Sequence, residues 1–243
     1  RKISKNIQNS SVDSIDSYAS RLRDVEEKKV IKSLIIAIIR SCESASEHGG
    51  WYGSMVPLIF PPLTGDETDI SKVLLIQDRI KRLLIKTFNY DISLEKYLYN
   101  FLVQNYISDL KEAETAFNYI SGKIEHVYGS VISKDKMFEE FSAEKSASSE
   151  GGYKLIDKAF EIYCSKEYDS IKIIEDHERS DPDTENKSRC EYLYVLGFGF
   201  DPLNLTKINL ISTRWLGGCF VTNYEDNKKI KRIILNTHCP RID

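Results

Sequence analysis

Two spacings of hydrophobic residues alternate along the chain, one typical of helices and the other of strands. Apolar side chains recur three and four positions apart in residues 14–42, 73–83, 92–106, 113–120, 155–163 and 226–236, which predicts helices. Short apolar runs predict strands at residues 83–88, 123–131, 171–174, 191–196 and 214–224. Because strands alternate with helices, the pattern predicts an α/β fold. We expect a Rossmann-like, mostly parallel sheet with helices on both faces, plus helical insertions.

Three segments fall outside this alternation. A short amphipathic helix is expected at residues 51–59, before two prolines that would stop it. Residues 134–152 are rich in charged and small side chains, which favours a mobile or lid-like loop. Residues 175–189 are acidic and contain proline, which favours a solvated loop.

A strand-to-helix turn is predicted at Asn89-Tyr90-Asp91, between the strand at 83–88 and the helix at 92–106. In open α/β sheets, ligands bind outside the carboxyl ends of the strands, because side chains and helix N-terminal amides converge there. A structural alternative stays open at this turn. Asp91 could simply cap the helix and Asn89 could close the turn.

Two later strand ends offer further candidates. His126 lies in or at the end of the strand at 123–131, where a single histidine can be either a structural residue or a catalyst. Gly197 and Gly199 follow the strand at 191–196, and glycines there let backbone approach a ligand closely. An ordinary tight turn is the alternative for the glycines, because G-x-G without a third glycine is a weak dinucleotide signal.

Composition narrows the class of protein. The chain has 243 residues, of which 41% are hydrophobic and 29% charged, and it fits one α/β domain spanning 1–243. A net charge of -3 gives no field that would draw nucleic acid or an anionic membrane. The longest apolar run, 34–39, is far short of the roughly 20 residues that span a bilayer. Five cysteines without a C-x-x-C pair indicate reduced thiols in a cytoplasmic protein and no four-cysteine zinc site.

Three motifs, in this order, resemble those of the sirtuin-like NAD-binding family, in particular bacterial proteins that act in antiphage defence. The motifs are Thr87-Phe88-Asn89-Tyr90-Asp91, His126-Val127-Tyr128-Gly129-Ser130 and Leu196-Gly197-Phe198-Gly199-Phe200-Asp201-Pro202-Leu203-Asn204. Family members carry T-x-N-x-D after a central strand, an H-G-S-like turn after the next strand, and G-x-G or G-x-S at a later strand end. The similarity covers roughly residues 14–210.

The resemblance implies an NAD glycohydrolase that hydrolyses the nicotinamide-ribose bond, with NAD as substrate or ligand and no metal. Asn89 would contact the ribose or position a water, Asp91 would hold the nicotinamide carboxamide, and His126 would be the base. The cofactor-binding residues implied are Thr87, Asn89, Tyr90, Asp91, Gly197, Phe198, Gly199 and Asn204. An amide and a carboxylate suit an oxocarbenium-like transition state of the kind found in glycoside hydrolysis. The expected partner is NAD or ADP-ribose, and a homo-oligomer or a partner protein is left open.

The sequence departs from the family in three ways. The family's base directly precedes Gly-Ser, but here Tyr128 precedes Gly129 and His126 lies two positions earlier. Residues two apart on a strand share a face, so His126 could still reach the site from about 6 to 7 Å deeper. The family's Gly-rich phosphate loop, expected upstream of Ser14, is not in this chain, and we expect an N-terminal piece to be missing. The family's cysteine zinc module is also absent, which argues against zinc-dependent protein deacylation.

These departures leave two alternatives to an enzyme. The chain could be a catalytically inactive sensor or interaction module that binds NAD or ADP-ribose. It could also be an interaction domain that binds no nucleotide.

Overall fold

The computed structural model describes residues 18–19, 21–43, 50–144, 155–173, 190–195 and 215–221. Its contacts divide the chain into two compact units, Arg1–His177 and Glu178–Asp243. The described part of the first unit is mostly helical with a short parallel strand pair, and the described part of the second unit is another parallel pair. These elements are compatible with the expected α/β class, while the single domain spanning 1–243 stays a prediction.

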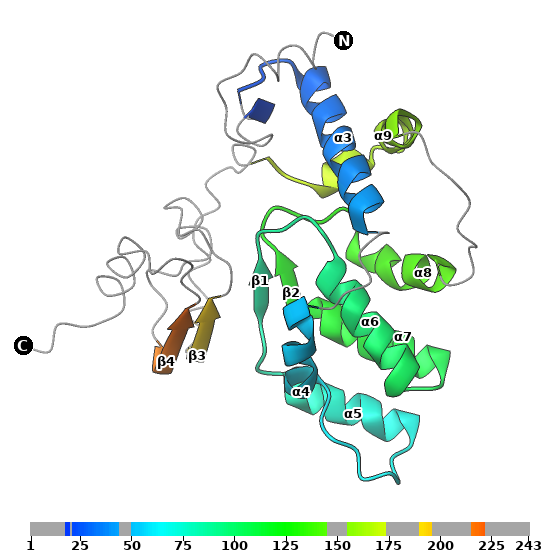
Figure 1. Cartoon of the computed structure of the whole chain (residues 1–243), viewed down its shortest axis with the longest axis vertical. Coiled ribbons are helices and arrows are strands. Elements are labelled where there is room, and N and C mark those ends of the chain that lie inside the picture. The colour runs from blue at the N-terminus through cyan, green and yellow to red at the C-terminus, as the bar shows by residue number, and fades with distance from the viewer. Residues whose placement is uncertain are drawn as a thin grey trace, which may run out of the picture. The chain divides into compact units, whose positions relative to one another are not determined.

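In chain order the elements of the first unit are α3 (Val25–Glu43), η1 (Gly50–Met55), α4 (Val56–Ile59), α5 (Asp69–Ile80), β1 (Ile85–Thr87), α6 (Ser93–Asn105), α7 (Leu110–Gly122), β2 (Ile124–His126), α8 (Lys134–Glu144), α9 (Leu155–Cys164) and η2 (Glu167–Ser170). In this unit α6 and α7 lie beside the strand pair, and α3 packs with α9 (Figure 1). The predicted helices within the described residues are confirmed, with shifted ends. None of the helices in these described ranges is long and apolar enough to cross a bilayer.

The core of the first unit forms around α6. Leu98 and Leu102, one turn apart on the same face, are fully buried. Between them Tyr99 packs edge-on against Phe117 of α7 and Phe138 of α8, with ring centroids 5.6 and 5.4 Å apart. This packing holds α6 against α7 and α8.

The C-terminal end of α3 is tied to the loops beside α6. Arg40 donates from Nε and Nη2 to the carbonyl of Val131, at 3.1 and 2.7 Å. Glu43 Oε1 accepts a hydrogen bond from the amide of Ile92 at 2.5 Å. The end of α3 therefore lies at the start of α6, although the two helices are far apart in the sequence.

The strand pair β1 and β2 is parallel, as the sequence predicts. Ile85, Lys86 and Thr87 lie opposite Ile124, Glu125 and His126. A short apolar run is typical of a buried parallel strand, but Leu84, just before β1, is 54% exposed, and the exposed Lys86 pairs with Glu125 at 3.0 Å. The short apolar run at 83–88 therefore makes a partly exposed strand.

The second unit contains β3 (Cys190–Val195) and β4 (Trp215–Val221), also parallel. Their register shifts near Gly218, which lies opposite Tyr192, so the glycines at 217 and 218 accommodate an irregularity within a real strand. Tyr194 and Phe220 lie opposite each other and stack with centroids 5.0 Å apart. Both rings are more than half exposed.

Two sequence predictions are corrected here. The loop predicted at 134–152 is wrong in its first part, where α8 forms, because Met137 and Phe141 lie one turn apart and bury against the core. The strand predicted at 171–174 is reduced to an isolated antiparallel bridge between Ile171 and Gly129. Ile171 is fully buried without a regular ladder, so its apolar character reflects core packing.

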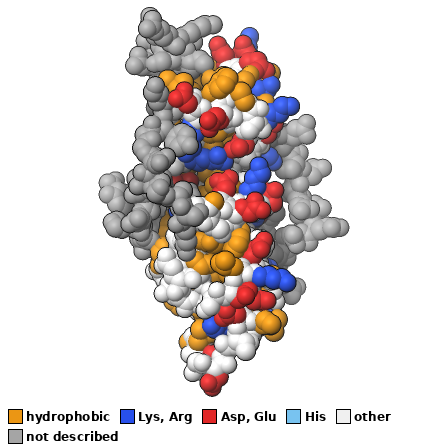
Figure 2. Space-filling view, turned by 90° about the vertical axis from the view of Figure 1, so that its right-hand side faces the viewer, with side chains coloured by type: hydrophobic (Ala, Val, Ile, Leu, Met, Phe, Trp, Pro, Cys, Tyr) orange, Lys and Arg blue, Asp and Glu red, His pale blue; other side chains and the backbone are white. Residues whose placement is uncertain are grey.

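Some predictions fall outside the described residues. These are the start of the first predicted helix at 14–17, the acidic loop at 175–189, the glycine turn at 197–199 and the helix at 226–236. On the described surface seen in Figure 2, acidic and basic side chains are interspersed with apolar ones. The apolar ones on α9 include Ile156 and Phe160, which are 76% and 66% exposed.

Candidate functional site

The carboxyl ends of β1 and β2 meet beside the start of α6. Thr87 lies opposite His126, and the amide of Val127 continues the ladder by donating to the carbonyl of Thr87 at 2.9 Å. Thr87 Oγ1 accepts from the amide of Asn89 at 3.1 Å, which shapes the turn toward α6. The pairing thus brings Thr87, Asn89 and His126 together, as the sequence predicts for parallel strands.

His126 contacts the protein through both ring nitrogens. Nδ1 lies 2.8 Å from the carbonyl oxygen of Asn89, and Nε2 lies 2.6 Å from Oε1 of Glu95. A carbonyl can only accept, so Nδ1 carries a proton and donates it to Asn89. Burial by itself lowers the pKa of His126, but the hydrogen bond and charge of Glu95, with the Asn89 carbonyl, raise the pKa above its ordinary 6.5.

Glu95 is a site residue that the sequence reasoning missed. It lies in the first turn of α6 and is 1% exposed, although it is a carboxylic acid. The spacing of apolar residues along this helix could have indicated Glu95. Glu95 occupies the same face as Leu98 and Leu102, three and seven positions on, so a charged residue stands within an apolar stripe.

Two further carboxyl groups lie at the start of α6. Asp91 Oδ1 accepts from the amide of Ser93 at 3.3 Å, and Glu43 Oε1 accepts from that of Ile92. Desolvation by burial is the main cause that raises the pKa of Glu43 to about 7, and the charges of Asp91 and Glu95 add to the rise. Asp91 is not the N-cap of α6 as the structural alternative expects, because the cap residue is Ile92; Asp91 contacts the first turn from the preceding position and also belongs to this carboxyl cluster.

Tyr128, which stands where the family has its histidine, is a packing residue. It is 5% exposed, with its ring centroid 5.8 Å from that of Phe88 and 6.4 Å from that of Tyr90. The Tyr90 hydroxyl donates to the carbonyl of Lys172 at 3.0 Å. The rings of Phe88, Tyr90 and Tyr128 therefore pack together beside the 88–90 turn. His126, two residues before Tyr128, is the side chain that contacts Asn89.

Gly129 is required by a close approach of backbone. Its φ is 81°, and a Cβ there would lie 2.0 Å from the carbonyl oxygen of Ser170. The neighbouring Tyr128 carbonyl accepts from the amide of Lys172 at 2.7 Å. The turn after β2 is therefore closed against the chain that follows η2.

The remaining predicted residues, Gly197, Phe198, Gly199 and Asn204, lie outside the described residues. Within the described ranges, His, Cys, Asp and Glu side chains form no group of three or more that could hold a metal ion. The residues placed at the strand ends are Thr87, Asn89, Tyr90, Asp91 and His126.

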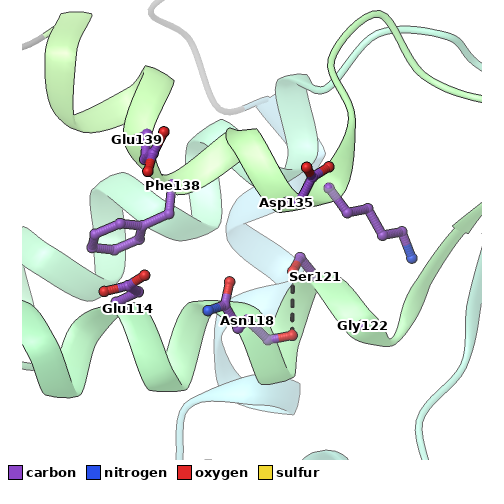
Figure 3. Close-up of a pocket in the computed structure, with 8 residues that line it drawn as sticks. Glu114, Asn118, Ser121, Gly122, Asp135, Phe138 and Glu139 are labelled. Carbon is purple, nitrogen blue, oxygen red and sulfur yellow. Dashed lines mark hydrogen bonds between the residues drawn. The ribbon is translucent and has the colours of Figure 1, made fainter. Parts of the chain in front are cut away.

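Two surface cavities lie away from this cluster. One, of about 350 Å³, lies between α7 and α8, where Phe138 and Glu139 face Glu114 and Asn118 (Figure 3). The other, of about 320 Å³, includes Arg40 in its lining. Neither lining includes Asn89, Asp91 or His126.

Comparison of the chain with protein-family models, with curated proteins and with solved structures gave no match.

Proposed function

We propose that the chain is an NAD glycohydrolase, which hydrolyses NAD to nicotinamide and ADP-ribose. The observation that carries the proposal is the contact between His126 and the Asn89 turn at the carboxyl ends of two parallel strands. A histidine, an amide and the carboxyl group of Asp91 are then available at the position where parallel sheets bind ligands. A Rossmann-like sheet, the NAD specificity and a role in antiphage defence are parts of this proposal that come from the family resemblance.

The proposed reaction needs a base and stabilisation of positive charge on the ribose. A water oxygen bonds to C1′ of the ribose while the C1′–N bond breaks and its electron pair returns to the ring of nicotinamide. His126 takes the proton that the water loses. The Asn89 side chain orients the water or the ribose, and Asp91 holds the carboxamide of the leaving nicotinamide.

The binding of the adenosine half is assigned by the resemblance alone. Gly197, Phe198, Gly199 and Asn204 would lie against it, and Thr87 and Tyr90 are further cofactor-binding residues that the resemblance implies.

The test is release of nicotinamide from NAD by the purified chain between about pH 6 and 9, where a histidine base changes its protonation. Asn89→Ala should lower the rate by about 10²-fold or more, the usual cost of a transition-state contact. Asn118→Ala, at an exposed position on α7, is the matched control and should leave the rate unchanged. A wild-type chain that releases no nicotinamide anywhere in this range ends the proposal.

One observation favours a second candidate, an inactive module that binds NAD or ADP-ribose. The side chain of His126 is only 3% exposed, and both of its ring nitrogens already have protein partners. A base must offer a free lone pair to the water, so this arrangement is closed to chemistry as it stands. Calorimetry with NAD and with ADP-ribose separates the candidates, since binding without nicotinamide release supports the inactive module.

A further inference from the structure

Glu95 and His126 form a buried pair that joins α6 to β2. Their side chains are 1% and 3% exposed, and the 2.6 Å distance between Oε1 and Nε2 is short, as in charge-assisted hydrogen bonds. On its other side, His126 faces the carbonyl of Asn89, a residue exposed to solvent. The two ring nitrogens therefore have different surroundings, since Nε2 faces Glu95 on α6 and Nδ1 faces the Asn89 turn at the carboxyl ends of the strands.

Counting protons on this pair distinguishes two states. In the structure Nδ1–H donates to Asn89, and a second proton lies between Nε2 and Glu95. A base needs Nδ1 without its proton, so the base-competent pair holds one proton fewer. In that form Nε2–H donates to the Glu95 carboxylate, and the lone pair of Nδ1 is free once the Asn89 carbonyl turns away.

We propose that Glu95 is the positioning residue of the site: it anchors Nε2 of His126, so that Nδ1 is the nitrogen that receives the proton from the attacking water. This inference rests on the proposed function. The closed pair first releases the Nδ1 proton to solvent. The water then bonds through oxygen to C1′, its proton moves to Nδ1, and nicotinamide leaves with the electron pair of the C1′–N bond. The Glu95 carboxylate stabilises the imidazolium that results.

Several charged groups face this pair and contribute to its titration. Lys134, at the start of α8, opposes protonation of His126. Glu43 at the end of α3 and Tyr52 of η1 both interact electrostatically with Glu95 and with Asp91. Lys96, next to Glu95 on α6, interacts with Glu43. Replacing Glu95 leaves all of these side chains in place, so the difference between wild type and variant reports the loss of the Glu95 charge together with its coupling to these neighbours.

The test combines Glu95→Gln with the pH dependence of nicotinamide release. The substituted side chain would keep an oxygen acceptor for Nε2–H without the negative charge, so the histidine should lose its proton more easily. We expect the acid side of the pH profile to move down by about one unit or more, the size of shift that a close opposite charge produces. The maximal rate should also fall, because a neutral amide stabilises an imidazolium less. Glu125→Gln is the control, since Glu125 is half exposed and pairs with Lys86 on the surface.

An NMR titration of the His126 ring in the whole chain gives a readout independent of activity, with His126→Gln used to assign the signal. In wild type the ring should titrate above 6.5 and carry its proton on Nδ1, and Glu95→Gln should lower the midpoint. If wild type cleaves NAD but Glu95→Gln leaves both the profile and the ring titration unchanged, the positioning role is refuted and the enzyme proposal stands. If wild type is inert but the titration shifts as expected, the enzyme proposal fails and the anchoring of Nε2 stands. If Glu95→Gln does not fold, a wild-type ring that titrates at or below 6.5 refutes the pairing.

Discussion

Replacing Glu43 with glutamine should make the protein more stable at neutral and alkaline pH. Glu43 keeps its proton in the folded protein up to about pH 7, whereas the ordinary value is 4.5. The unfolded chain therefore loses this proton first as pH rises, and by linkage the free energy of unfolding decreases between about pH 4.5 and 7. Glutamine cannot ionise, but it retains an oxygen that accepts from the amide of Ile92.

The expected gain in the free energy of unfolding follows from the difference between the folded and the ordinary pKa of Glu43. A difference of about 2.5 pH units, from 4.5 to about 7, corresponds to at most about 3.4 kcal/mol. Glu43 is partly exposed, so screening by solvent should leave on the order of 1 to 2 kcal/mol. Glu43→Gln should therefore match wild type near pH 4 and exceed it by about that amount at pH 8.

Urea unfolding followed by circular dichroism at several pH values measures this difference directly. Titrating groups distant from Glu43 contribute equally to wild type and variant, so only the difference between the two curves is interpreted. Glu114→Gln, at an exposed position on α7, controls for the loss of one negative charge. A difference between Glu43→Gln and wild type that stays constant from pH 4 to pH 8 would refute the reasoning.

Three further changes test the fold around the site. Gly129→Ala should destabilise the chain by about 2 kcal/mol or more, because a Cβ would clash with a backbone carbonyl at a φ of 81°. Gly122→Ala, where nothing lies within 4 Å of the added Cβ, is its control in thermal unfolding, and equal losses in both would contradict the clash. Phe117→Ala should cost about 3 to 5 kcal/mol in urea unfolding, because Phe117 is fully buried, and a loss below about 1 kcal/mol would contradict that packing. Asp109→Ala should cost about 1 kcal/mol by the same assay, because Asp109 caps two amides of α7, and an unchanged midpoint would exclude the cap.

Hydrophobic periodicity was sufficient to predict most helices and the parallel strand pair. The helix predicted at 92–106 forms as Ser93–Asn105, because its apolar positions keep helical spacing and all pack on one side. The same reasoning failed for α8, where Met137, Phe138 and Phe141 are three large apolar residues among many charged ones. Their contribution depends on the partners that α7 and α6 supply, and a local window cannot see those partners.

Some residues of the candidate site could likewise be predicted from the sequence, and others could not. Asn89, Asp91 and His126 could be predicted because the ends of neighbouring parallel strands meet, which is a rule of topology. Glu95 and Glu43 could not be reached by that rule, since each acts through a contact between elements distant in the sequence. Glu95 had a local signal, a charge within an apolar stripe. Glu43 had no such signal, because it is the last residue of α3 and its contact with Ile92 cannot be seen in the local sequence.

The burial of His126 with Glu95 is not explained by stability alone. The core around Leu98, Tyr99 and Phe117 is well packed and apolar, and an apolar pair of similar volume at these two positions would avoid the desolvation of two ionisable groups. Buried ion pairs are often no more stabilising than such replacements. A histidine held at a strand end, with Nε2 on Glu95 and Nδ1 on the Asn89 carbonyl, does supply something that an apolar pair cannot, namely a titratable group with a fixed orientation. That difference is the physical reason to look for chemistry at this end of the strands.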